Sequence, residues 1–326
     1  MLATTLRLWL RRRSGRERRV AAVAVTVVVL AAAALIVLLL ARHPAAPAAA
    51  PSRSGRAAQR GGSPPNPASQ AALAAAAAAR RQAAAWVASQ VSRSSITACD
   101  PVMCSALQAQ GVPAASLLVL GPSATDPLGS AVVVSTAAIR SQFGARLSSV
   151  YAPTVLAAFG TGTARVEVRV TAPDGSVAYL SSLSSDLRAR IAGGTHLLGN
   201  SNIGATGPVR QQLAAGQVDA RLLSNLVTLA GLERVQIVSF YDGGPGSSAG
   251  VPLRAVELAS PPLRPGARGG QLGYLNSVLA FVRAQRAPFL ASSATLQRIS
   301  PRQVVVRIEF AAPSPLGLLG NDGAAR

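Results

Sequence analysis

Two cysteines enclose an aspartate in the sequence CDPVMC, residues 99–104, and the chain has no other cysteine. The spacing of Cys99 and Cys104 differs from the Cys-x-x-Cys spacing of redox dithiols. We therefore expect a structural disulfide, with free buried thiols as the alternative. Asp100 follows a predicted strand and precedes a predicted helix. It is interpreted as the cap of that helix, or as an acid at the sheet edge where ligands of α/β proteins bind.

A glycine-rich loop, residues 243–250, follows Asp242 and a predicted strand over Val235–Phe240. Backbone N–H groups of such loops can bind an anion. Asp242, Gly243, Gly244 and Gly246 are therefore candidate binding residues. The alternative is a flexible connection between two strands, because the loop has no phosphate-binding G-x-x-x-x-G-K pattern.

Catalytic candidates are few. His43 falls in a predicted spacer, so His196, at a predicted helix end, is the only histidine of the predicted globular part. His196, Asp100 and Asp242 are the weak candidates for acid–base catalysis. There is no G-x-S-x-G elbow, and no signature selects a pair of acids. An enzyme is therefore the less favoured interpretation.

The basic residues are all arginine, 32 of them against 12 acidic residues, and the formal net charge is +20. The absence of lysine excludes Schiff-base chemistry and the P-loop lysine. Two histidines and two cysteines leave little for a metal site, and we expect no cofactor. Nucleic acid is rejected as a partner, because no aromatic-basic interleaving or zinc-finger spacing accompanies the charge.

An uncharged apolar segment at residues 20–41 follows an arginine-rich segment at residues 1–19. It is long enough for a membrane-spanning helix, and the positive-inside rule places residues 1–19 in the cytoplasm and the rest outside the membrane. A cleaved signal peptide is the alternative. Such an anchor contacts the lipid bilayer, and its arginines attract anionic headgroups. A Pro/Ala-rich spacer is expected over residues 42–68.

Strands and helices alternate beyond the spacer, which favours a parallel, mostly parallel or mixed sheet in each of two α/β lobes. We expect an Ala-rich helix over 69–94, a first lobe over 95–162 with its boundary at Gly162, a second lobe over 163–313 and a tail over 314–326. The strands are predicted at 96–99, 117–120, 131–135, 154–159, 165–172, 235–240, 253–258 and 303–310. Helices are predicted at 101–110, 136–147, from 175 through 191, at 208–232 with a break near 216, and at 272–283.

Three resemblances add expectations. Residues 85–91, 96–100 and 107–113 resemble the soluble outer domains of bacterial membrane glycosyltransferases, which implies a helix, a strand ending in Asp, a helix and a second strand. The multi-span part that performs glycosyl transfer is absent here, so that activity is not implied. The segments CDPVMC (99–104), VDARLL (218–223) and APSPLGLL (312–319) are similar to single-pass membrane proteins of high-GC actinobacteria, which have no known activity.

The stretch Val235–Leu258 resembles OmpA-type peptidoglycan-binding modules, which place an Asp after a strand and an Arg further on. This resemblance implies binding roles for Asp242 and Arg254. Pro252 stands where that family has helix, and the family's Asn is missing.

These observations favour a membrane-anchored, extracytoplasmic, non-catalytic module that binds cell-wall polymer or a membrane-protein partner. An envelope hydrolase acting on wall or glycan, and a structural subunit of a membrane complex, are the alternatives.

Overall fold

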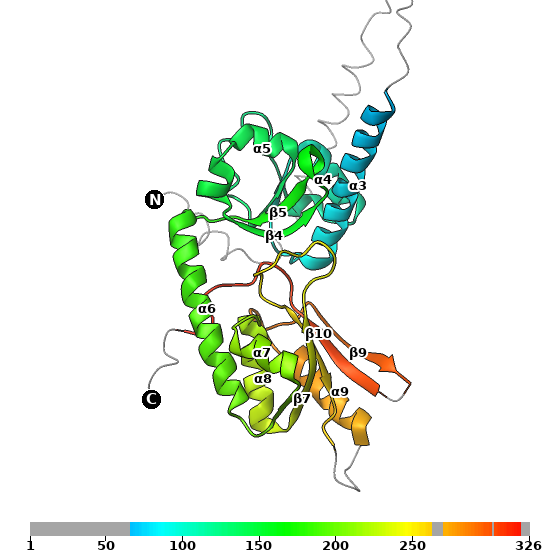
Figure 1. The fold of residues 1–326 in the computed structure, drawn as a ribbon, viewed down its shortest axis with the longest axis vertical. Coiled ribbons are helices and arrows are strands. Elements are labelled where there is room, and N and C mark those ends of the chain that lie inside the picture. The colour runs from blue at the N-terminus through cyan, green and yellow to red at the C-terminus, as the bar shows by residue number, and fades with distance from the viewer. Residues whose placement is uncertain (1–65, 263–269, 302, 321–326) are drawn as a thin grey trace, which may run out of the picture. The chain divides into compact units, whose positions relative to one another are not determined.

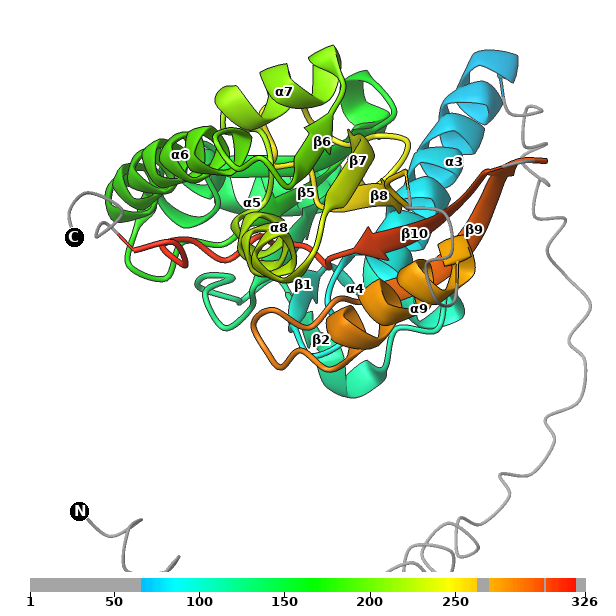
Figure 2. The ribbon, with the colours of Figure 1, turned by 90° about the horizontal axis from the view of Figure 1, so that it is seen from below.

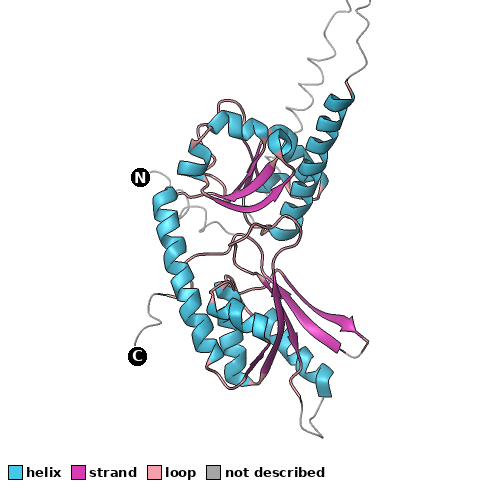
Figure 3. Cartoon of the chain, in the orientation of Figure 1, coloured by secondary structure: helices cyan, strands magenta, loops and turns pink. Residues whose placement is uncertain are grey.

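The computed structural model describes residues 66–262, 270–301 and 303–320. The predicted membrane span at residues 20–41, the segment before it and nearly all of the spacer lie outside these ranges. None of the helices within these ranges has both the length and the apolar character needed to cross a membrane. The described chain is a mixed α/β structure with two five-stranded sheets (Figures 1 and 3).

The strands and helices fall close to the expected positions. The strands are β1 (Thr97–Cys99), β2 (Leu117–Val119), β3 (Val132–Ser135), β4 (Thr154–Phe159), β5 (Val166–Val170), β6 (Ile203–Ala205), β7 (Val235–Tyr241), β8 (Ala255–Ala259), β9 (Ser293–Ser300) and β10 (Gln303–Glu309). The helices are α3 (Pro67–Gln90), α4 (Pro101–Ala109), α5 (Ala137–Phe143), α6 (Ser176–Leu198), α7 (Gly207–Ala214), α8 (Ala220–Leu232) and α9 (Gly270–Arg283).

The first sheet has the order β2-β1-β3-β5-β4. β1 pairs in parallel with β2 and β3, whereas β5 is antiparallel to both β3 and β4. The boundary expected at Gly162 is therefore corrected: β5 follows it in the chain and is nevertheless a central strand of the first sheet. Chain order could not show this, because the three-residue turn at Gly162–Ala164 only reverses the direction between β4 and β5.

Helices cover both faces of the first sheet. α3 is rich in alanine, which favours helix, and its second half buries Ala83, Trp86 and Val87 with α4 against one face. Its first half is more exposed, with 71% of Leu73 accessible. On the opposite face, Ile139 and Phe143 of α5 pack with Tyr151. Tyr151 belongs to a π-helical turn at Leu147–Tyr151, whereas α5 itself ends at Phe143, within the stretch predicted as helix over 136–147. Helices therefore cover both faces of the sheet, and strands β1 and β3 are buried throughout.

The second sheet has the order β6-β7-β8-β10-β9, with only β6 and β7 parallel. Its inner face forms one core with α7, α8 and α9, where leucines of α8 meet alternate residues of β7, β8 and β10. The other face carries half-buried polar side chains, among them Tyr241, Glu257, Arg307 and Glu309. This alternation is the period-2 pattern of a sheet with one covered face.

Of the expected alternatives, mixed sheets are confirmed and mostly parallel sheets are wrong, because three of the strand pairings are parallel and five are antiparallel. Two strands, β6 and β9, are additional to those expected. α6 also runs past Ile191 to Leu198 and includes the glycine pair Gly193-Gly194. Gly194 lies against the Leu213 carbonyl of α7, where a Cβ would clash. Figure 2 shows α6 and α7 side by side.

Candidate functional site

A pocket of about 320 Å³ lies where the C-terminal end of α3 meets the second sheet. Its walls come from the end of α3, the loop after β7, the start of β8 and the end of β10. The residues lining it are Gln90, Tyr241, Asp242, Gly243, Gly244, Arg254, Ala255, Arg307, Glu309 and Phe310. The pocket therefore brings together four of the five residues proposed from the sequence as binding residues.

Arg254 is the innermost charge of this pocket, with only 3% of its surface accessible. Its Nη1 donates to the Phe310 carbonyl at 3.1 Å, and its other contacts, with the carbonyl and the side-chain oxygen of Gln90, are long at 3.5 Å. Its Nε is buried without a partner, and Arg254 makes no ion pair with any carboxylate of the described residues. Burial lowers the pKa of Arg254 to about 10, against the opposing effect of Asp219 and other acids.

The backbone of Gly243 passes close to the side chain of this arginine. A Cβ at residue 243 would lie 2.5 Å from Nη2 of Arg254 and closer still to Oε1 of Gln90. Real Cβ atoms do not approach heavy atoms so closely, so a side chain at residue 243 would make the flexible ends of Arg254 and Gln90 shift. Gly243 therefore marks a place where side chains from other elements come close to the backbone, as glycines in or near strands often do.

The rest of the glycine-rich loop divides between the pocket and the first sheet. Asp242 is exposed at the pocket rim, and its Oδ1 accepts a hydrogen bond from the Gly244 N–H at 3.1 Å. Gly246 lies elsewhere: its carbonyl accepts from Ala158 N of β4 at 2.8 Å, and a Cβ there would collide with the Phe159 ring. Gly246 is therefore a contact between the loop and β4, and it is not among the residues that line this pocket.

A second cation stands on the open side of the pocket. Arg307 donates to Glu309 at 2.7 Å and lies 4.3 Å from the centre of the Tyr241 ring. Its charge is balanced by Glu309, unlike that of Arg254. Burial raises the pKa of Tyr241, an effect that Arg307 opposes and that Glu309 and Glu257 add to. The phenol is therefore neutral at pH 7 and makes no hydrogen bond of ordinary geometry within the described chain.

The buried ion pair between Asp219 and Arg221 provides a comparison with Arg254, because its arginine is paired with an acid. Asp219 caps α8, is 1% exposed, and accepts from Nε and Nη2 of Arg221 at 2.9 and 2.8 Å. Ser314 donates to the same carboxylate. Although burial raises the pKa of Asp219, the bonds from Arg221 and Ser314 outweigh that effect and hold it below its ordinary value. Arg221 is thus fully compensated, whereas Arg254 is not.

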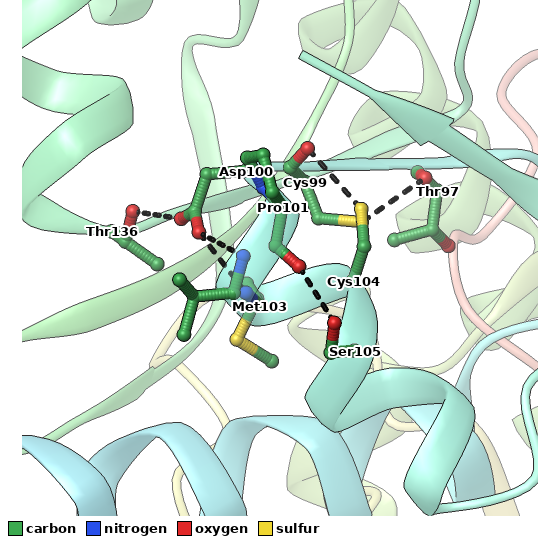
Figure 4. Close-up of a disulfide and its surroundings, with 9 residues drawn as sticks. Thr97, Cys99, Asp100, Pro101, Met103, Cys104, Ser105 and Thr136 are labelled. Carbon is green, nitrogen blue, oxygen red and sulfur yellow. Dashed lines mark hydrogen bonds between the residues drawn. A yellow bond between two sulfur atoms is a disulfide. The ribbon is translucent and has the colours of Figure 1, made fainter. Parts of the chain in front are cut away.

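Asp100 serves as a helix cap, and the disulfide expected beside it is present (Figure 4). Its Oδ1 accepts from the Val102 and Met103 N–H groups, both at 3.0 Å, and its Oδ2 accepts from the Thr136 hydroxyl. Both carboxylate oxygens are therefore occupied at the carboxyl ends of β1 and β3. The structure favours the capping interpretation of Asp100 over a catalytic one.

His196 lies exposed in the last turn of α6, as expected for a helix end. No hydrogen bond joins any two of His196, Asp100 and Asp242 in the described chain. His196 lies in α6, Asp100 follows β1 and Asp242 follows β7. The same residues contain no cluster of three or more potential metal ligands. Of the weak catalytic candidates, only Asp242 lines the Arg254 pocket.

Comparison with protein-family models, with curated proteins and with solved structures found no match to this chain. The site is therefore interpreted from its own geometry. The sequence did not predict four residues that line the pocket: Gln90, Tyr241, Arg307 and Glu309. Arg307 and Glu309 share one face of the alternating strand at 303–310, and that alternation could have marked them. Gln90 gave no signal, because 164 positions separate it from Arg254.

Proposed function

We propose that this protein is a membrane-anchored, extracytoplasmic binding module of the cell envelope, and that its Arg254 pocket holds an acidic group of cell-wall polymer. The observation that carries the proposal is Arg254 itself, a buried guanidinium that lines an open pocket and forms no ion pair with a carboxylate of the described residues.

The free energy of burying a charge supports a ligand at this position. Moving an ion out of water costs several kcal/mol unless another charge or good hydrogen bonds compensate it. Arg254 has one bond of ordinary length, from Nη1 to the Phe310 carbonyl. An anion entering the pocket would supply the missing compensation, and arginine is the side chain best suited to hold a carboxylate by two parallel hydrogen bonds.

The arrangement supports binding more than catalysis. Acid–base or nucleophilic catalysis needs titratable groups placed together around one substrate. Asp100 caps a helix, and His196 is exposed at the end of α6. The envelope location is carried by the sequence, through the apolar segment at 20–41 and the arginines before it. The disulfide supports it, because such bonds persist in oxidising compartments.

The test is retention of the detergent-solubilised full chain on purified cell wall at low and high salt. We expect retention at low salt that falls at high salt, since exposed charge interactions are screened. Arg307→Gln, at the pocket, should weaken retention more than Arg210→Gln, which removes the same charge from an exposed position of α7. No retention at either salt concentration would contradict the proposal and favour the membrane-protein partner, to be sought by crosslinking in intact cells.

A further inference from the structure

A second pocket, of about 470 Å³, lies on the other side of the glycine-rich loop. Asp242 lines both pockets, so the two adjoin at the same loop residue. The residues lining the second pocket are Leu183, Ser184, Leu187, Arg190, Ala215, Gly216, Gln217, Asp242, Ser248, Ala249, Gly250, Val251 and Leu253.

The second pocket has the opposite chemical character to the first. Leu183 and Leu187 of α6 face it together with Val251 and Leu253. Its one cation, Arg190, is bound to Asp186 at 2.7 Å in a buried ion pair, and it also donates to the Gly216 carbonyl. Arg190 is already compensated, and the carboxylate of Asp242 lies where the two pockets adjoin. The leucines and Val251 therefore offer an apolar surface that suits an aliphatic group.

The loop between the pockets presents backbone rather than side chains. A Cβ at Gly244 or at Gly250 would meet nothing within 4 Å, so both glycines border open space. The N–H groups of Gly243 and Gly250 make no hydrogen bond within the described chain. Gly250 combines an unbonded N–H with open space, and such a group can pair with a carbonyl group of another extended chain.

The charge of the first pocket limits the anion it can hold. Arg254 and Arg307 are balanced in number by Asp242 and Glu309, which gives a formal charge of zero for these four residues. A carboxylate brings one negative charge, whereas a phosphate monoester or free phosphate brings up to two beside the same acids. The pocket therefore favours a carboxylate.

We propose that the two pockets together bind a peptide with a free carboxylate, the carboxylate at Arg254 and an aliphatic side chain against Leu187. This inference rests on the proposed function and specifies it: the acidic group of the wall is the carboxyl end of its peptide part.

The experiment uses Trp86 as the reporter, because its ring lies 5.8 Å from the Arg254 guanidinium carbon. The chain contains two tryptophans, so Trp9→Phe in the full chain leaves Trp86 alone. The probes are N-acetyl-alanyl-leucine in its L,L and D,D forms, the C-terminal amide of each, and 4-methylpentanoate, which has the carboxylate and the aliphatic end without a peptide group. Fluorescence titration in detergent gives the Kd of each probe.

We expect at least one form of the free peptide to bind about tenfold or more tightly than its amide, because the amide cannot compensate Arg254. It should also bind more tightly than 4-methylpentanoate. Leu187→Glu should weaken peptide binding severalfold, since an aliphatic contact is replaced by a charge. Leu272→Glu, the same change at a more exposed position of α9, should leave the Kd unchanged.

Equal affinity for acid and amide, equal affinity for 4-methylpentanoate, or an unchanged Kd in Leu187→Glu would overturn the inference. Wall retention that still falls in Arg307→Gln would show in that case that the proposed function stands and only the ligand assignment fails. Loss of both wall retention and peptide binding in the parent chain would contradict both proposals.

Discussion

The guanidinium of Arg254 lies over the indole ring of Trp86, 5.8 Å from the ring centre, and so joins the end of α3 to the start of β8. Both partners are almost completely buried. A cation over an aromatic face gains about 0.5–2 kcal/mol, which is less than the cost of burying the charge. The contact therefore positions Arg254 without compensating it, and a ligand remains the natural partner.

Replacing Arg254 with methionine should separate stability from binding. Because Arg254 is buried without an acid, we expect Arg254→Met to keep the free energy of unfolding within about 1–2 kcal/mol of the parent, since apolar residues often replace buried charges at little cost. Binding to purified wall should fall about tenfold or more. The measurements are thermal unfolding and retention on wall.

Arg221→Met is the matched variant, because Arg221 is also a buried arginine of this protein but is paired with Asp219. Its removal should cost about 3–5 kcal/mol, as breaking a buried pair leaves one charge uncompensated. If the Arg254 variant loses as much stability as the Arg221 variant, then Arg254 is a structural residue and the interpretation of its pocket is wrong.

Adding one methyl group at residue 243 should disturb the pocket. Gly243→Ala places a Cβ against the flexible ends of Gln90 and Arg254, which must shift, so we expect little loss of stability but weaker retention on wall. Gly121→Ala is the control, since a Cβ there meets no atom within 4 Å and its φ is not in the left-handed region. An alanine at 243 with parent retention would contradict the close approach.

The Asp219–Arg221 pair should make stability depend on pH. The folded pKa of Asp219 is below its ordinary value of about 3.9. Its contribution is therefore fully present above about pH 4 and is lost as the pH falls through the folded pKa. The difference in unfolding free energy between the parent and Asp219→Asn should be largest near pH 7 and shrink below about pH 4. A difference that stays constant from pH 7 to pH 3 would show that the carboxylate charge does not matter.

The disulfide should protect the fold rather than take part in binding. It closes a small loop, so the double variant Cys99→Ala/Cys104→Ala should lose about 2 kcal/mol of stability on the chain-entropy estimate. Retention on wall should not change, because neither cysteine lines the Arg254 pocket. Both cysteines are buried, so thiol labelling after reductant treatment should require denaturant. Rapid labelling of the native protein would contradict the burial.

Local sequence pattern predicted the well-patterned elements of this fold. Strand β10 alternates apolar and polar residues, and α9 repeats its apolar residues at helical spacing, and both were found where expected. Strand β9 was missed because it is an edge strand whose residues are mostly exposed, so its sequence, SATLQRIS, shows little apolar alternation. β6 was missed because it has only three residues, one of them glycine.

Features that depend on distant residues could not be predicted in the same way. The placement of β5 in the first sheet depends on its pairing with β3 and β4, and no local signal distinguishes this from the start of a second sheet. At the pocket, Asp242 and its glycines were predicted from the loop composition. The absence of a partner for Arg254 could be seen only from its surroundings, because Gln90 and Phe310 come from opposite ends of the described chain.

The central claim is that Arg254 holds an acidic group of the wall. The most direct test mixes equal amounts of parent chain and Arg254→Met, each with a different fluorescent label, on the same purified cell wall at low salt. We predict that the bound fraction is enriched in the parent about tenfold or more. Equal amounts of parent and variant on the wall, with both folded, would contradict the claim.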